Sequence, residues 1–259
     1  MRQSLDFLSL AQAVAAVHRA VRRLGIGLTV HEDFDALKAL VQSLPNRHPL
    51  APAFDPGATE SLPFFDRFWI KGVDGAGRCV HLQAAGLLDL GEETLGQHLD
   101  RSLACYAAAR QSLDGTVSRA VLADVRNRSG LICYHGECWL DRDWRGFKQG
   151  NLSSHLPRLC LLLVLARWNP DLVWAITHSR HVESGLPSRS GYHHIQPRAF
   201  RWRGGGADGD EWIMWMDRGD VLLLMDLLAM EAEETVSPVS LPSQRAAARA
   251  AGAGPGSAA

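Results

Sequence analysis

The sequence predicts a mixed α/β (α+β) domain in which a mostly antiparallel sheet is flanked by helices. Three stretches carry this prediction. Residues 67–90 have the pattern of an antiparallel hairpin, residues 130–177 that of strand, loop, helix and strand, and residues 192–216 that of a second antiparallel pair. A strand–helix–strand unit joins parallel neighbours through a right-handed crossover, so one pair of strands should be parallel.

The chain is expected to begin with a helix, because apolar residues recur at helical spacing through residues 1–24. A short strand at Leu28–Val30 follows. Asp33 can cap a helix over Phe34–Leu44, which a proline then ends. Residues 45–63 carry five prolines and little periodicity, so we expect a loop there.

The hairpin is the clearest local prediction. Arg67–Val73 and Arg78–Leu90 are rich in aromatic and β-branched residues, which favour strands. The glycines of residues 74–77 permit the positive φ of a tight turn. These two runs should therefore pair antiparallel.

An insert at about residues 91–127 separates the hairpin from the next strand. It should contain a helix near Glu92–Ala109 and a polar stretch at Asp124–Ser129. Strand character returns over Gly130–Leu140, and Asp141-Arg142-Asp143 ends it.

The following pattern is helical over Leu152–Trp168, and Pro157 should kink this helix or mark a restart. Leu172–Thr177 resembles a buried strand. A short helix around His181–Ser190 should end at Gly191, which suits a C-terminal cap.

The last strands are expected at Tyr192–Trp202 and Glu211–Met216, on either side of a glycine-rich turn. A helix over Asp220–Glu231 follows. Residues 237–259 are Ala, Ser, Pro and Gly for the most part, too little apolar surface to offset their ordering entropy, so this tail should be disordered. Residues 25–236 then form a single domain.

Bulk composition excludes several kinds of partner. Of the 259 residues, 46% are hydrophobic, ample for a core, and the net charge of −1 attracts neither nucleic acid nor an anionic membrane. The cysteines are odd in number and lack CxxC spacing, so we expect no disulfide framework, no zinc site and a cytoplasmic location. Residues 1–24 lack signal-peptide features. The apolar run Leu159–Ala166 is far shorter than the roughly 20 residues that span a bilayer.

Two further features have structural interpretations. His193 and His194 would point to opposite faces of a strand and could not jointly ligate one ion, so no metal is expected. The apolar stripes of residues 1–24 and 219–232 are too wide to leave in water. These helices should pack on the domain or on a twin subunit, which makes a homodimer possible.

The segment over residues 136–151 carries the clearest functional pattern. A strand breaks, and the chain passes Arg145 and Gly146 before it enters a helix. A helix N-terminus exposes unpaired N–H groups and the positive end of its dipole, so a glycine-containing loop there can wrap a diphosphate. Lys148 adds charge, and Gly150 allows close backbone approach.

These residues resemble the GNAT superfamily of acyl-CoA-dependent N-acyltransferases. The family's signature is Arg or Gln, two residues, Gly, one residue, then Gly or Ala, and it lies over Arg145, Gly146, Phe147, Lys148, Gln149 and Gly150. Lys148 stands in place of the first family glycine. The order of elements also agrees over roughly residues 28–217, including the Gly-aromatic pair Gly191-Tyr192. The resemblance implies a splayed parallel strand pair, between which the pantetheine arm of acetyl-CoA or another acyl-CoA is held.

The resemblance also implies the site. The splayed strands correspond to residues 136–141 and 173–178, and the contacts to the acyl-CoA would come from Leu140, Asp141, Arg145, Gly146, Phe147, Lys148, Gln149, Gly150 and Asn151. Pro187 replaces the family's leaving-group Tyr, so the acid would be His178, Ser184, Ser188 or a water. The acceptor ammonium must lose a proton before it attacks, and the base would be Glu137 or, as second choice, His135.

Three functions remain open at this stage. The first is transfer of an acyl group, most simply acetyl, from CoA to the amine of a small metabolite or peptide. The second uses an acyl carrier protein and a long acyl chain, as in the N-acyl amino acid synthases of this architecture, with residues 45–63 and 91–127 forming a tunnel. The third is a catalytically silent GNAT-like binding module, which the missing Tyr and the substituted glycine favour.

Overall fold

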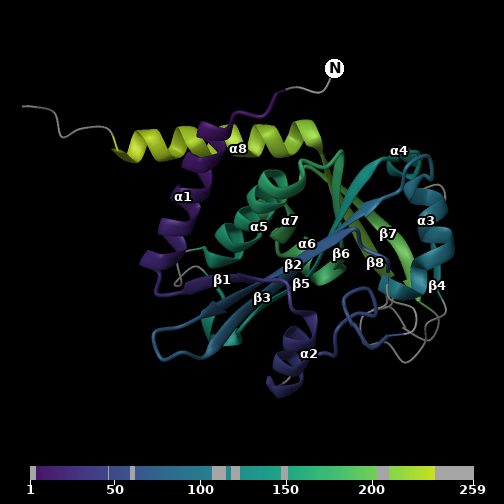
Figure 1. Ribbon diagram of the computed structural model, residues 1–259, viewed down its shortest axis with the longest axis horizontal. Helices are drawn as coiled ribbons and strands as arrows, with labels where there is room; N and C mark the ends of the chain where they lie inside the picture. Colours follow the sequence, from purple (N-terminus) through teal and green to yellow (C-terminus); the bar gives the residue numbers. More distant parts are fainter. Residues whose placement is uncertain are drawn as a thin grey trace, which may run out of the picture.

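The computed structural model describes residues 4–45, 47–58, 62–106, 115–117, 123–146, 151–202 and 210–236. Within these ranges eight strands form one sheet in the order β1-β2-β3-β5-β6-β8-β7-β4 (Figure 1). Only the pair β5–β6 is parallel. The strands are β1 (Gly27–His31), β2 (Asp66–Val73), β3 (Cys79–Asp89), β4 (Gly115–Val117), β5 (Leu131–Leu140), β6 (Leu172–His178), β7 (His194–Trp202) and β8 (Asp210–Asp217).

The β2–β3 hairpin confirms its sequence pattern. Asp74 Oδ1 accepts the backbone N–H of Ala76 and of Arg78, and Gly77 closes the turn with a φ of 79°. Strand β3 is buried along most of its length, and half of the residues of β2 are buried. The hairpin therefore forms the centre of the N-terminal half of the sheet.

One face of the sheet is covered by α1 (Phe7–Arg23), α5 (Leu152–Trp168) and α8 (Arg218–Val236), which pack on one another (Figure 1). Asp6 caps α1 by accepting the N–H groups of Leu8 and Ser9, and a stripe at helical spacing is buried: Leu10, Ala13, Val17 and Val21. Helix α5 is buried on almost every side because α1, α7 and the sheet surround it. It is the central element of this layer.

The opposite face is covered by α2 (Phe34–Ser43), the described parts of residues 45–63, α3 (Leu95–Ser102), η1 (Leu103–Tyr106) and α4 (Ala123–Arg126). Asp33 caps α2 as expected. The core beneath them is aromatic, and its rings contact one another: Phe34, Phe54, Phe64, Tyr106, Tyr134, Trp174 and Phe200. The described parts of the insert at residues 91–127 thus contribute to this core, and β4 lies at the edge of the sheet beside β7.

Three local expectations need correction. The helix expected over His181–Ser190 is two short ones, α6 (Ser179–Glu183) and α7 (Leu186–Ser190), because Gly185 between them adopts a φ of 72°. Helix α5 continues through Pro157 without a restart. The polar stretch Asp124–Ser129 contributes to α4. The turn expected at residues 204–209 and the tail from 237 lie outside the described residues.

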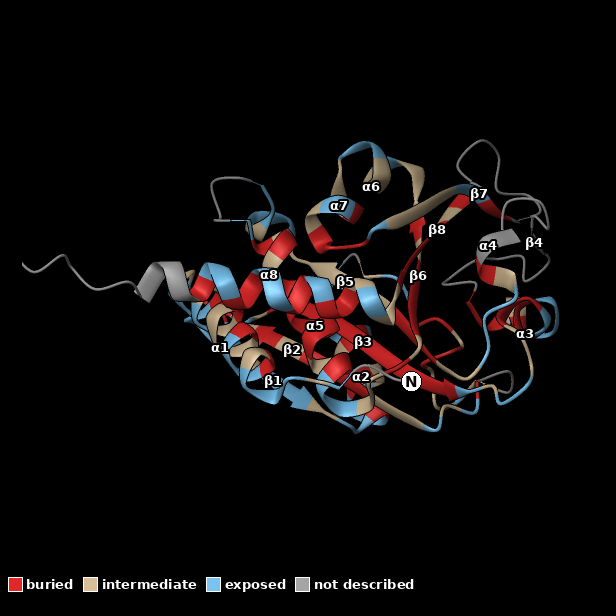
Figure 2. Ribbon diagram, turned by 90° about the horizontal axis from the view of Figure 1, so that it is seen from above, coloured by how far each residue is buried: buried red, intermediate tan, exposed pale blue. Residues whose placement is uncertain are grey.

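Helix α8 has one buried face and one face in solvent (Figure 2). On the outer face, Leu223, Leu227 and Met230 are exposed and follow helical spacing; we call them the α8 stripe. Packing of α8 on the domain is confirmed by its contacts with α1 and α5, and a twin subunit over the α8 stripe stays a prediction. None of the helices in the described ranges is long and apolar enough to cross a membrane.

Candidate active site

The parallel strands β5 and β6 separate at their C-terminal ends. They pair only at Ile132↔Leu172, Cys133↔Val173 and Tyr134↔Trp174. Beyond Tyr134, β5 continues to Leu140 along β3, whereas β6 continues to His178 along β8. The adjacent edges of β5 and β6 therefore lose their ladder partners, and we call the region between these two unpaired edges the cleft. This is the splay that the resemblance implied.

A β-bulge shapes the β5 wall of this cleft. Leu82 faces Trp139 and Ala84 faces Gly136, so that two residues of β5, Glu137 and Cys138, stand opposite the single residue Gln83. Glu137 has a φ of 55°, a left-handed conformation that costs an L-residue roughly 1–2 kcal/mol. A bulge leaves a backbone group without a ladder partner, here beside the cleft.

The side chain of Glu137 anchors the loop that follows α2. Its Oε2 accepts a hydrogen bond of 2.6 Å from Arg47 Nη2, and its Oε1 accepts one of 2.9 Å from the Ala51 N–H. Arg47 also donates to the Glu137 carbonyl oxygen at 3.2 Å. Burial raises the pKa of Glu137 above its usual value, and the charge of Arg47 offsets part of this effect. Both carboxylate oxygens are engaged, so Glu137 is less suited to be the base than the sequence suggested.

The next residue, Cys138, is the second residue of the bulge. The residue as a whole is exposed, but the surrounding protein desolvates its thiol and raises the pKa to about 11, against the opposing charges of Arg47 and Arg145. Cys138 also acts electrostatically on Tyr192 and Cys160, which lie on the α5 side of the sheet. The thiol therefore lies among protein groups on that side.

Across the cleft, His178 and Glu211 form a cross-strand pair at the end of β6 and the start of β8. His178 Nδ1 lies 3.4 Å from Glu211 Oε1, and the imidazole is 39% exposed while the carboxylate is 9% exposed. Burial and then the charges of Glu137 and Glu211 raise the pKa of Tyr134. Both carboxylates therefore face the neighbourhood of Tyr134, the last residue paired before the splay.

His135, the second choice for the base, is buried in a hydrogen-bonded chain. Gln83 Nε2 donates to the Leu156 carbonyl oxygen at 2.8 Å, which directs Gln83 Oε1 to His135 Nε2 at 3.2 Å. His135 Nε2 must then carry the proton, and Nδ1 accepts the phenol proton of Tyr192 at 2.8 Å. Burial lowers the pKa of His135 to about 4. This chain holds β3, β5 and α5 together, and neither ring nitrogen of His135 is available to a substrate.

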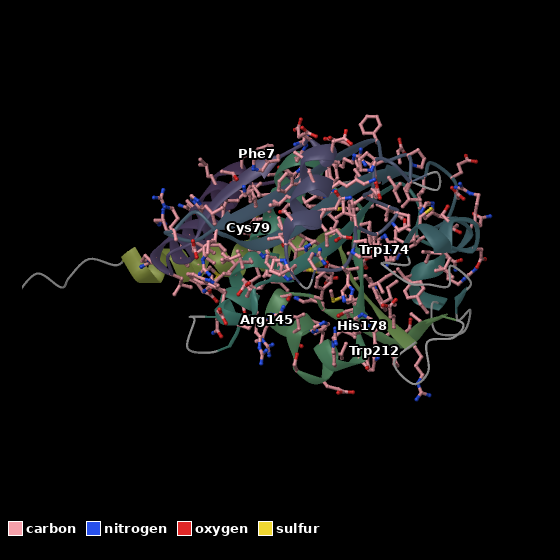
Figure 3. The ribbon with its side chains drawn as sticks, turned by 90° about the horizontal axis from the view of Figure 1, so that it is seen from below. Phe7, Cys79, Arg145, Trp174, His178 and Trp212 are labelled. Atoms are coloured by element: carbon pink, nitrogen blue, oxygen red, sulfur yellow. The ribbon has the colours of Figure 1, made fainter. Side chains whose placement is uncertain are left out.

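The residues expected at the diphosphate lie between β5 and α5. Leu140 ends β5, and Asp141 caps η2 (Arg142–Trp144) by accepting the Asp143 N–H. Arg145 Nε donates to the Leu140 carbonyl oxygen at 2.7 Å. In Figure 3 Arg145 and His178 lie on the same side of the ribbon.

The charges of Arg145 and His178 both reach His181 of α6. Burial is the largest cause of the shift in the pKa of His181, and the charge of Arg180 is the second. Together with the charges of His178 and Arg145 they lower this pKa to about 4. Arg145 therefore lies near the β6 side of the cleft as well as at the end of β5.

The loop itself is described at both ends. Gly146 has a φ of 98°, and a Cβ added there would meet no atom within 4 Å, so one side of the backbone is open. Asn151 is the N-cap residue of α5, and its carbonyl oxygen accepts the N–H groups of Ser154 and His155. Phe147, Lys148, Gln149 and Gly150 lie outside the described residues, and their contacts with a diphosphate stay a prediction.

The two serines proposed as acids lie in and beside α7. Ser184 Oγ donates to the His181 carbonyl oxygen at 2.8 Å, and the Ser184 carbonyl oxygen accepts from Arg189. The Ser188 carbonyl oxygen accepts the Gly191 N–H at the end of α7. Local bonds therefore hold the Ser184 hydroxyl, which makes it a weaker candidate than His178.

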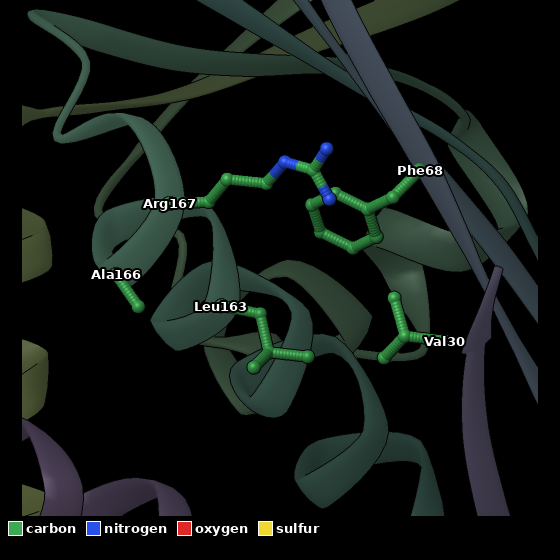
Figure 4. Close-up of a pocket in the computed structure, with 5 residues that line it drawn as sticks. All are labelled: Val30, Phe68, Leu163, Ala166 and Arg167. Carbon is green, nitrogen blue, oxygen red and sulfur yellow. The ribbon is translucent and has the colours of Figure 1, made fainter. Parts of the chain in front are cut away.

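A crevice of about 220 Å³ lies elsewhere, lined by Val30, Phe68, Leu163, Ala166 and Arg167 (Figure 4). Its titratable residue, Arg167, is paired with Asp66 and Glu32, each at 2.7 Å. Leu163 and Arg167 belong to the last turns of α5, roughly 16–22 Å along the helix from its first turn. This crevice lacks the chemistry of the cleft and lies at the other end of α5.

Sequence reasoning missed Arg47, Cys138, His181 and Glu211. Glu211 faces His178 only because of the β6–β8 register, and Arg47 reaches Glu137 from a loop 90 positions away. The one usable signal was that Glu211 begins a strand that should pair near β6.

Comparisons with known proteins were made with the whole chain. No protein-family model and no curated protein sequence matches it. Among solved structures, a spermidine N-acetyltransferase SpeG chimera from Vibrio cholerae and human SSAT is 8% identical over 77% of this chain and 99% of its own, with a TM-score of 0.42. Aminoglycoside acetyltransferase AAC(6')-Ib, in complex with coenzyme A and kanamycin, is 11% identical over 75% of this chain and 96% of its own, with a TM-score of 0.41.

A third similar structure is FeeM, an N-acyl amino acid synthase from uncultured soil microbes. It is 12% identical over 89% of this chain and 96% of its own, with a TM-score of 0.38. At these identities and scores, the function of the cleft has to be argued from its own geometry.

Proposed function

We propose that the protein is an N-acyltransferase that moves an acyl group, most simply acetyl, from acyl-CoA to the amine of a small metabolite or peptide. The observation that carries this proposal is the opening of β5 away from β6 beyond Tyr134 and Trp174. An extended chain that contains amides, such as pantetheine, can bond to strand edges that lack a ladder partner. The cleft offers two such edges, which run side by side toward α5.

The far end of the cleft suits the diphosphate. Helix α5 begins at Leu152, and the N-terminus of a helix attracts an anion with its free N–H groups and its dipole. Arg145 lies at the approach to this helix, with Nε held by Leu140 and the remainder of the guanidinium able to bind a phosphate. Leu140, Asp141 and residues 146–151 complete the proposed contacts.

The reaction would take place near the bulge. The amine nitrogen attacks the thioester carbonyl carbon, negative charge develops on the carbonyl oxygen, and the C–S bond then breaks. The backbone at Glu137 and Cys138, displaced from the β3 ladder, is the candidate donor to that oxygen. This role requires only main-chain atoms, so it does not conflict with the contacts of the Glu137 carboxylate.

For proton transfer we favour His178 over the other candidates. It is the exposed imidazole at the mouth of the cleft, and Glu211 at 3.4 Å can orient it and stabilise its charged form. His178 would take the ammonium proton, directly or through a water. The leaving thiolate would receive a proton from water, from the returned His178 proton or, less favourably, from Ser184. Glu137 would then serve to position the bulge.

The acyl donor that the protein binds distinguishes the three functions that the sequence left open. The buried side chains among the described parts of residues 45–63 and 91–127 pack into the aromatic core, which favours a short acyl group over a long one. A silent binding module would bind acyl-CoA without turning it over. The choice rests on donor binding and on turnover, measured separately.

Thermal-shift measurements with CoA, acetyl-CoA, long-chain acyl-CoA and an acyl carrier protein would test donor binding. A ligand at 100 times its dissociation constant stabilises the native state by about 2.7 kcal/mol. We expect acetyl-CoA and CoA to stabilise the protein and acyl carrier protein to have no effect. Release of free thiol with a panel of amines then tests turnover. If none of the donors stabilises the protein, the proposed function is wrong.

A further inference from the structure

A cluster of metal-type donors lies where β8 ends and α8 begins. One ligand atom from each of His194, Asp217 and Asp220 lies within 4.8 Å of the others. His194 Nε2 is 3.1 Å from Asp220 Oδ2, and His193 Nδ1 is 3.1 Å from Asp220 Oδ1. Two imidazoles therefore meet one carboxylate, with a second carboxylate beside it.

Contrary to the prediction from their sequence pattern, His193 and His194 do not point to opposite faces of a strand. Strand β7 begins at His194, so the alternation of a strand does not constrain His193, and both rings reach Asp220.

The fold holds the donors in place from three elements. His194 faces Trp215 in the β7–β8 ladder, and its ring stacks on the indole with centroids 5.1 Å apart. Asp217 ends β8 and donates its N–H to Asp220 Oδ2 at 2.8 Å. Arg128 Nη2 binds Asp217 Oδ2 at 2.7 Å. The rings and carboxylates are thus oriented before any ion arrives.

Helix capping explains only part of this arrangement. As a cap, Asp220 needs one oxygen for the Asp217 N–H, and no imidazole is required. The other oxygen of Asp217, Oδ1, is buried and has no hydrogen-bond partner among the described residues, which is unfavourable for a carboxylate. Two neighbouring carboxylates also repel each other. A bound cation would relieve both effects.

We propose that His194, Asp217 and Asp220 bind one divalent transition-metal ion of the zinc class, with His193 holding the other oxygen of Asp220. Imidazole nitrogen and carboxylate oxygen suit zinc and its neighbours, whereas magnesium and calcium prefer oxygen alone. Ligands about 2.1 Å from one ion lie roughly 3.0–3.4 Å apart, close to the 3.1 Å between His194 Nε2 and Asp220 Oδ2. The ligand atom of Asp217 lies within 4.8 Å of the other two.

Arg128 fits this site as an outer partner. Hydrogen bonds to the ligands orient them, and such partners commonly affect metal affinity. The bound ion would join β7, β8 and α8 just after Tyr192, whose hydroxyl belongs to the chain at the cleft. The site is separate from the cleft and does not depend on the acyl transfer proposed for it.

The test is calorimetric titration of ZnCl₂ into untagged, EDTA-treated protein, with MgCl₂ as a second titrant. We expect one zinc ion per chain and no magnesium binding at the same concentrations. His194→Ala and Asp220→Asn should each weaken zinc binding at least about a hundredfold, because each removes a direct ligand and loss of an outer partner alone weakens binding 10- to 100-fold. His18→Ala, on α1 and outside the cluster, is the matched control and should keep the wild-type affinity.

Circular dichroism of each variant distinguishes the loss of a zinc ligand from misfolding. Zinc should raise the Tm of wild type and of His18→Ala but not of the two cluster variants. Wild-type protein that binds no zinc, or zinc binding that either cluster variant leaves unchanged, would overturn the proposal.

Discussion

The buried pair Arg47–Glu137 gives the sharpest test of how the cleft wall is held. Its side chains are 10% and 5% exposed, and the closest N···O distance is 2.6 Å. Removal of one partner from a buried pair destabilises a protein by about 3–5 kcal/mol, because a charge is left uncompensated. Arg47→Met keeps most of the aliphatic volume and removes the charge. We expect it to lower the free energy of unfolding by this amount at pH 8.

The loss of stability in Arg47→Met should depend on pH in a definite direction. Burial already raises the pKa of Glu137 in the folded protein, and without Arg47 this pKa should rise further. A carboxyl group whose pKa is higher in the folded state than in the unfolded state contributes stability at pH values below its unfolded-state pKa. This contribution is lost as the pH rises through the folded-state pKa. The deficit of Arg47→Met should therefore be smaller at pH 5 than at pH 8.

Urea titration followed by tryptophan fluorescence measures both quantities. Adding Glu137→Gln to Arg47→Met should recover part of the loss, because it removes the buried charge. The exposed pair Arg101–Glu93, with side chains 63% and 30% exposed, supplies the control: Arg101→Met should cost no more than about 1 kcal/mol. A loss below about 1 kcal/mol for Arg47→Met, or equal losses at the two pH values, would refute the reasoning.

Four further predictions follow from the cleft and the surface. Arg145→Ala should weaken CoA binding about ten- to a hundredfold, since a charge-assisted hydrogen bond contributes roughly 1.5–3 kcal/mol; unchanged affinity in calorimetry would remove Arg145 from the site. Glu211→Gln should lower kcat and shift the pH–rate profile assigned to His178 with little change in the CoA dissociation constant, and an unaltered profile would contradict the pairing. Tyr192→Phe leaves His135 Nδ1 buried without its donor, so the free energy of unfolding from urea titration should fall by about 1–3 kcal/mol. A loss under 0.5 kcal/mol, roughly the size of an ordinary surface substitution, would count against the proton assignment. Light scattering at micromolar concentration should give a dimer mass if the α8 stripe is an interface, and a strict monomer would exclude it.

Much of the fold followed from local patterns. The hairpin, the helix caps at Asp33 and Gly191, and helices α1 and α5 depend on neighbours within a few residues, and sequence periodicity reports such neighbours directly. The parallel pair β5–β6 followed from chain order, because a strand–helix–strand unit has few ways to close. The approach of Arg145 to a helix N-terminus could also be predicted for the same reason.

Only the tertiary structure decided which side chains meet at the cleft and at the junction of β8 and α8. The pairing of Arg47 with Glu137, of His178 with Glu211 and of two imidazoles with Asp220 depends on strand register and on a bulge. A shift of one residue in register moves a side chain to the opposite face of the sheet. Register is set by the packing of the whole core, which joins residues far apart in the chain. The sequence by itself therefore determined the order of the elements, while long-range packing determined which side chains meet around them.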